Sequence, residues 1–132
     1  MQIVVLYIST ALVFLLLDAI MLKFVMRPVF EQQIGAWLLQ DIRVAPAIGF
    51  YLLYVAGVLW FVSLPALRSG DPLNALVSGA RLGAMAYGTY EFTNLATLRN
   101  WAWHMVAIDV TWGALLTGVA ALAGVVVARW AF

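Results

Sequence analysis

The sequence predicts an all-α fold: a four-helix transmembrane bundle with a short amphipathic surface helix between the first and second spans. Of the 132 residues, 66% are hydrophobic and only 10% are charged. A soluble domain is about half apolar and about a quarter charged. The apolar residues form runs of roughly 20 residues, which is the length of a helix that crosses a bilayer. Proline, glycine and charged residues separate these runs.

The composition also excludes several classes of function. The net charge is +1 and the basic residues form no stripe, so nothing favours a nucleic-acid partner. The chain has no cysteine, which excludes disulfides, thiolate catalysis and cysteine-bound metals. No linker, repeat or soluble segment interrupts the pattern. Residues 1–132 are therefore predicted to form a single integral-membrane domain.

The four spans are predicted from the apolar runs, at about residues 3–22, 46–64, 72–98 and 102–127. Pro28 suits the first turn of a new helix, and Pro65 closes the second span. Asp71 suits the N-cap of the third span. Gly79 and Gly83, four residues apart in that span, form a pair of small residues that lets a neighbouring helix approach closely.

The hydrophilic stretch between the first two spans predicts an amphipathic helix at about residues 28–41. Phe30, Ile34, Trp37 and Leu38 recur at helical spacing, and glutamate and glutamine lie mostly between them. A helix with one apolar and one polar face can lie on the membrane surface. A loop that caps the bundle explains the same residues equally well, and the two interpretations are compatible.

Three acids, Asp18, Glu91 and Asp109, lie inside predicted spans. Ionisable residues are costly in a membrane, so they face the bundle interior and mark functional sites. Because successive helices alternate in direction and rise about 1.5 Å per residue, the three carboxylates reach one depth, about 5–12 Å below the interface on the surface-helix side. They predict an acid-lined pocket in one leaflet, with these residues as its acid/base set. Like charges this close cannot all ionise, so at least one should carry a proton near neutral pH.

Further polar and aromatic side chains fall at a similar depth and are the candidate ligand-binding residues. They are Tyr51, Tyr54, Tyr87, Tyr90, Asn94 and Trp112. Polar residues also hold membrane helices together, so Asn94 fits that role as well as a ligand contact. His104 lies about 140° around the helix from Asp109, and no metal site or cofactor is predicted.

Four segments resemble one known family. They are LDAI at 17–20, FYLLYVAG at 50–57, YGTYEFTNLAT at 87–97 with Trp101 after it, and IDVTWG at 108–113. In this order they are similar to a bacterial membrane-protein family catalogued as domain of unknown function 2177. The family commonly has aspartate at the position of Glu91 and often tryptophan at that of Met21. The resemblance implies that Asp18, Glu91, Asn94, Asp109 and Trp112 are signature positions.

The resemblance also implies a location, although it implies no reaction. We expect a multi-pass protein of the bacterial inner membrane. The basic residues are almost evenly divided between the two sides, so the positive-inside rule alone does not orient the chain. Relatives are richer in arginine around the turn at Arg68, which favours a cytoplasmic location for both termini.

The pocket predicts binding or conversion of a lipid-like amphiphile by carboxylate acid/base chemistry, and leaves open whether the protein is an enzyme. An accessory or scaffold subunit of a larger membrane complex is the alternative, and proton or cation translocation is a weaker one. The expected partners are membrane lipids and a lipid-like small molecule. A homo-oligomer or a partner in a membrane complex stays open.

Overall fold

A computed structural model describes residues 1–37 and 43–132, and nearly all of them are helical. The first helical stretch comprises α1 (Gln2–Met21), η1 (Leu22–Met26) and α2 (Arg27–Ile34), followed by the short turn η2 (Gly35–Trp37). The second comprises α3 (Val44–Val58), η3 (Leu59–Ser63) and α4 (Leu64–Ser69). α5 (Pro72–Thr97) and α6 (Trp103–Ala131) are the third and fourth. The described residues, 1–37 and 43–132, contain no strand, so the all-α class is confirmed.

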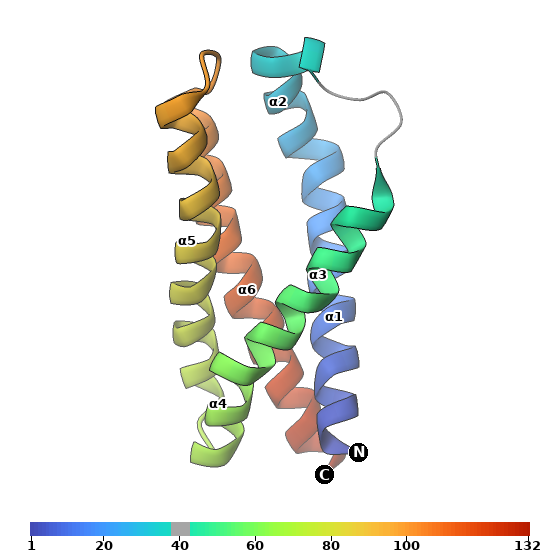
Figure 1. Ribbon diagram of the computed structural model, residues 1–132. Helices are drawn as coiled ribbons and strands as arrows, with labels where there is room; N and C mark the ends of the chain where they lie inside the picture. The colour runs from blue at the N-terminus through green and yellow to red at the C-terminus, as the bar shows by residue number, and fades with distance from the viewer. Residues whose placement is uncertain (38–42) are drawn as a thin grey trace.

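The four stretches run alternately up and down, and both termini lie at the same end (Figure 1). Three stretches in the described part of the chain are long and apolar enough to cross a membrane: Gln2–Ile34, Val44–Ser69 and Trp103–Ala131. α5 has 26 residues but is the least apolar of the four. Candidate spans by length and composition therefore number three, where the sequence predicted four.

The first two stretches continue through prolines at which the sequence predicted a break. Proline has no N–H, and its ring collides with the carbonyl group four residues earlier in a regular helix. η1 ends two residues before Pro28 and η3 ends two residues before Pro65, and both are π-helical turns. The wider π turn relieves the collision, so each helix passes its proline instead of ending there.

This continuity corrects the predicted surface helix at residues 28–41. α2 extends the first stretch beyond α1 and is not a separate helix (Figure 1). Residues 38–41 of that prediction lie outside the described residues. The second stretch likewise continues past residue 64 to Ser69, whereas α5 and α6 begin within a residue of their predicted starts.

Glycines bring α5 and α6 into close contact. A Cβ on Gly79 would lie 2.9 Å from the Gly118 Cα atom, and one on Gly83 would collide with the Gly113 carbonyl group. The ring of Tyr87 fills the position that a side chain on Gly113 would need. The predicted role of the Gly79 and Gly83 pair is therefore confirmed.

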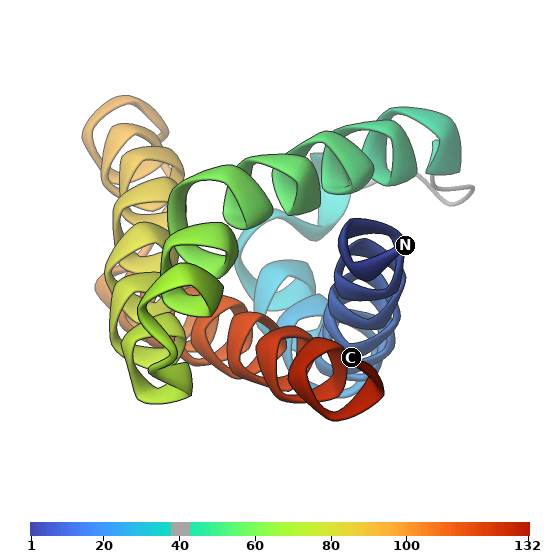
Figure 2. The ribbon, with the colours of Figure 1, turned by 90° about the horizontal axis from the view of Figure 1, so that it is seen from below.

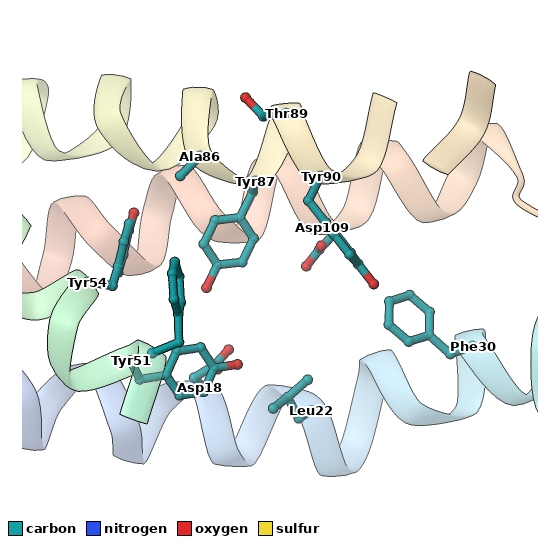
Figure 3. Close-up of a pocket in the computed structure, with 11 residues that line it drawn as sticks. Asp18, Leu22, Phe30, Tyr51, Tyr54, Ala86, Tyr87, Thr89, Tyr90 and Asp109 are labelled. Carbon is teal, nitrogen blue, oxygen red and sulfur yellow. The ribbon is translucent and has the colours of Figure 1, made fainter. Parts of the chain in front are cut away.

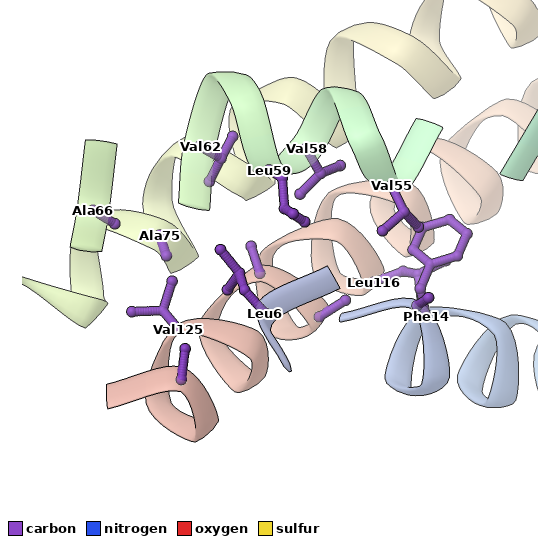
Figure 4. Packing of buried hydrophobic residues seen from close by; sticks show 14 residues of the cluster. Leu6, Phe14, Val55, Val58, Leu59, Val62, Ala66, Ala75, Leu116 and Val125 are labelled. Carbon is purple, nitrogen blue, oxygen red and sulfur yellow. The ribbon is translucent and has the colours of Figure 1, made fainter. Parts of the chain in front are cut away.

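The larger hydrophobic cluster lies mainly in the half of the bundle near the termini, and a smaller one around Trp101 and Met105 lies at the opposite end. Leu6, Val58 and Val125 meet in the larger cluster from three different stretches (Figure 4). The turn before α5 is held by local contacts: the Asp71 side chain accepts a hydrogen bond from the Leu73 N–H at 3.1 Å, as predicted for an N-cap.

α3 crosses the bundle obliquely (Figures 1 and 2). α3 itself packs on α1, whereas its continuation through η3 and α4 packs on α5 and α6. The second stretch therefore closes the bundle near the termini and diverges from α5 toward the opposite end. That opposite end holds the candidate site.

Gly83→Ala should destabilise the bundle by about 1–3 kcal/mol, because a methyl group there would overpack against backbone atoms. Gly88→Ala on the same helix is the matched control, since its added Cβ would meet only the Phe92 ring, at 4.0 Å. Alanine also favours a helix over glycine by about 1 kcal/mol, so the control should be neutral or stabilising. Thermal unfolding of the detergent-solubilised variants measures both. Equal unfolding temperatures for the two variants would disprove the tight contact.

Candidate functional site

A cavity of about 730 Å³ lies between the helical stretches, in the half of the bundle away from the termini (Figure 3). All four stretches contribute to its wall. Its lining residues are Asp18, Leu22, Phe30, Phe50, Tyr51, Tyr54, Ala86, Tyr87, Thr89, Tyr90 and Asp109. The wall is thus mostly aromatic and aliphatic, with two carboxyl groups and four tyrosine hydroxyls as its main polar groups. A small number of polar groups in an apolar wall is typical of small-molecule sites.

Asp18, on α1, is the most deeply buried acid of the cavity wall. Its side chain is only 3% exposed. The indole N–H of Trp112 on α6 donates a hydrogen bond to its Oδ1 atom at 3.2 Å. Its Oδ2 atom has no hydrogen-bond partner among the described residues. Because a buried polar atom without a partner is costly, this oxygen needs a donor, and the hydroxyl group of Tyr51, which interacts with the Asp18 carboxyl group, can supply one.

Asp109, on α6, lies between the other two acids. It is 8% exposed and lines the cavity together with Asp18, with which it interacts electrostatically. On its other side it adjoins the carboxyl group of Glu91. The structure thus brings all three predicted acids together, from three different helical stretches.

Glu91, on α5, is completely buried but does not line the cavity. The Trp101 indole N–H donates a hydrogen bond to its Oε1 atom at 3.0 Å. Trp101 lies in the turn between α5 and α6, and its ring also packs on Phe30 of α2 and on Tyr90. Glu91 is therefore held behind the cavity wall by the turn that follows its own helix.

Four tyrosines surround the cavity acids. Tyr51 and Tyr54 of α3 pack on Phe14 with ring centroids 5.6 and 5.5 Å away. The Tyr54 hydroxyl group is 2.9 Å from that of Thr117, which anchors it to α6. Tyr87 packs against Tyr54 from the opposite wall. These contacts fix the orientation of the rings that face the cavity.

The structure separates the predicted site residues into two sets. Asp18, Asp109 and the four tyrosines line the cavity, as Figure 3 shows. Glu91, Asn94 and Trp112 do not, although Trp112 reaches the site indirectly through Asp18.

Sequence analysis missed several parts of the wall. Phe30, Phe50, Leu22, Ala86 and Thr89 line the cavity without carrying an unusual polar signal. The hydrogen bond from Trp101 to Glu91 was not predicted either. The sequence signal for the pair of Glu91 and Trp101 is an acid near the end of a predicted span, with a tryptophan ten residues later in the turn that follows.

The cavity wall is acidic and carries no positive side chain. Among the described lining residues there is no lysine, arginine or histidine. Across residues 1–37 and 43–132, no three histidine or acidic side chains are grouped so that they could hold one metal ion. The chemistry available at the wall is therefore that of carboxyl and phenol groups, which accept or donate protons and hydrogen bonds.

Trp101→Phe should destabilise the protein by about 1–3 kcal/mol, because it leaves a buried carboxyl group without its donor. Trp103→Phe, two residues further on, is the matched control because Trp103 is 72% exposed. In a Glu91→Leu background the Trp101→Phe substitution should cost much less. Thermal unfolding of the wild type, the two single variants and the double variant forms a double-mutant cycle, and additive effects would show that the two side chains do not act as a pair.

The comparisons with known proteins agree with the membrane character of the helices. A family described as "Predicted membrane protein (DUF2177)" matches residues 3–126, which is nearly the whole chain. No curated protein and no solved structure matches it. The chain therefore belongs to the membrane-protein family known as domain of unknown function 2177.

Proposed function

We propose that this protein binds a lipid-like amphiphile in the cavity between α1, α2, α3, α5 and α6. The observation that carries the proposal is a largely apolar cavity with two buried carboxyl groups in its wall. Its volume of about 730 Å³ falls in the range of about 300–1,000 Å³ that is usual for small-molecule sites. An amphiphile matches both the apolar lining and the polar groups.

The oblique course of α3 supports access from the side. Phe50 on α3 and Tyr90 on α5 both line the cavity, and they are 62% and 52% exposed. They therefore lie at a mouth on the outer surface of the bundle, which faces lipid chains when the helices cross a membrane. An alkyl chain could enter there without crossing water.

The carboxyl groups offer acid–base chemistry to a bound molecule. Asp18 and Asp109 face the cavity directly, and Tyr87 is placed to orient a ligand between them. Glu91 adjoins Asp109 from behind and acts on a ligand through it. If the amphiphile is converted as well as bound, proton transfer at these two aspartates is the chemistry that the wall supports.

We further propose that all four stretches cross the membrane. α5 packs along α6 and runs antiparallel to it, joined by a short turn (Figure 1). At about 1.5 Å per residue its 26 residues extend about 39 Å, which exceeds the apolar thickness of a bilayer. Glu91 is covered by neighbouring helices, and the exposed Arg81, ten residues into the helix, can extend its side chain toward the interface. We place the protein in the bacterial inner membrane, with both termini in the cytoplasm.

Packing within the bundle weakens the case for an accessory subunit. The small residues through which a partner helix could approach closely include Gly79, Gly83, Gly113, Gly118 and Gly124. Each lies against atoms of a neighbouring helix of the same chain. Amphiphile binding is therefore the better proposal.

The topology can be tested with single cysteines, because the natural chain has none. Gln2→Cys and Ser69→Cys should react with a membrane-impermeant maleimide from the same side, and Asn100→Cys from the opposite side. The readout is labelling of intact cells compared with opened cells. If Ser69→Cys and Asn100→Cys react from one side, α5 does not cross the membrane.

Ligand binding can be tested with a photoreactive probe, a dodecyl chain that carries a diazirine and an uncharged maltoside head group. We expect it to label the cavity wall of the protein in maltoside micelles. Ala86→Trp should reduce this labelling about tenfold or more, because the indole would fill the mouth.

Met85→Trp is the matched control, since Met85 is 71% exposed and does not line the cavity. Mass spectrometry of the labelled peptides locates the probe. Labelling spread evenly over the outer surface, and equal in the two variants, would argue against an amphiphile site.

A further inference from the structure

The cavity combines negative charge with aromatic rings. Asp18 and Asp109 supply the carboxyl groups, and six rings line the same space: those of Phe30, Phe50, Tyr51, Tyr54, Tyr87 and Tyr90. Figure 3 labels Tyr51, Tyr87 and Tyr90 beside the two acids, with Tyr54 and Phe30 further along the same space. Since no cationic side chain is among the described lining residues, nothing in this wall balances an ionised carboxylate.

The Oδ2 atom of Asp18 also indicates that a cationic group is missing from the wall. Asp18 is 3% exposed and lines the cavity, and this oxygen has no partner among the described residues. Its other oxygen already accepts from Trp112. A buried carboxyl group of this kind is stabilised by a strong donor or by a positively charged group. The Tyr51 hydroxyl beside Asp18 can supply a hydrogen bond, but the described lining residues supply no positive charge.

We propose that the cavity is selective for an amphiphile with an ammonium head group, bound between Asp18 and Asp109 and the surrounding tyrosine rings. Aromatic faces attract an organic cation through their negative π systems, and desolvation strengthens the attraction. The carboxyl groups of the wall add ion pairing, because a bound cation favours their ionised forms. This proposal rests on the proposed function and specifies the head group of its ligand.

Other head groups fit the wall less well. A phosphate or sulfate would meet two carboxyl groups with no cation beside them, and like charges repel strongly in a site of low dielectric constant. An alcohol could donate one hydrogen bond to Asp18 but would use neither the second acid nor the ring faces. An ammonium group can interact with both carboxyl groups and with the ring faces.

The experiment measures competition against the maltoside photoprobe in maltoside micelles, which contain no ammonium groups of their own. Three competitors share one dodecyl chain and are compared at equal mole fraction at pH 7: dodecyltrimethylammonium, dodecanol and dodecyl phosphate. Tetramethylammonium, which has the head group without the chain, shows whether the source must be an amphiphile. We expect dodecyltrimethylammonium to compete at least about tenfold more strongly than the others.

Variants separate the charge from the rings. Asp18→Asn and Asp109→Asn should each lose most of the ammonium preference, whereas Glu31→Gln, an exposed acid in an ion pair with Arg27, should keep it. If the aspartate variants fail to fold, Tyr90 provides the second test because its side chain lies at the exposed mouth. Tyr90→Phe should keep the preference and Tyr90→Leu should reduce it several-fold.

The outcomes distinguish the two proposals. If dodecanol or dodecyl phosphate competes as well as the ammonium compound, the head-group assignment is overturned and the amphiphile site stands. If no dodecyl compound competes and the probe label is not confined to the cavity, the proposed function itself fails. If tetramethylammonium competes as well as its dodecyl counterpart, the ligand is a free organic cation and the assignment to an amphiphile is overturned.

Discussion

The close contact between α5 and α6 determines where the cavity can form. Gly83 and Gly113 let the two backbones meet, and the ring of Tyr87 occupies the space above Gly113. This contact places Tyr87 and Asp109, which come from different helices, on one wall of the cavity. α1 then packs on α6, where Gly124 accommodates Thr10, and so brings Asp18 opposite that wall. The glycines at the helix contacts therefore determine where the tyrosine and aspartate side chains of the cavity wall lie.

Glu91 and Asp18 have the same number of hydrogen bonds but different roles. Glu91 and Asp18 each accept one hydrogen bond from a tryptophan, and each keeps a second oxygen without a partner among the described residues. Glu91 is sealed behind the wall, so its bond to Trp101 fixes the turn between α5 and α6. Asp18 lines the cavity, although its unpaired oxygen is itself covered by neighbouring atoms. The same chemistry stabilises the fold in one place and leaves a binding group in the other.

Depth along the helices was predictable from the sequence, and rotation about them was only partly predictable. The rise per residue and the cost of a carboxylate in lipid were enough to bring Asp18, Glu91 and Asp109 to one end of the bundle. They could not show that Glu91 turns toward Trp101, because that depends on how the turn at residues 98–102 folds back. Pro28 and Pro65 misled for a similar reason. A π turn lets a helix continue past proline, and sequence patterns alone rarely reveal one.

The π turn before Pro65 also explains why the bundle stays open on one side. This turn, η3, and α4 after it pack against α5 and α6, while α3 before it leans toward α1 and away from α5 (Figure 1). Mainly aliphatic side chains fill the half of the bundle near the termini, whereas bulky aromatic side chains surround the acids at the cavity. A second cluster around Trp101 and Met105 closes the far end. Rings held by Phe14 and Thr117 resist collapse into the space. Lipid chains can fill the apolar mouth whatever their head group, so selectivity must arise at the inner wall, where Asp18 and Asp109 lie.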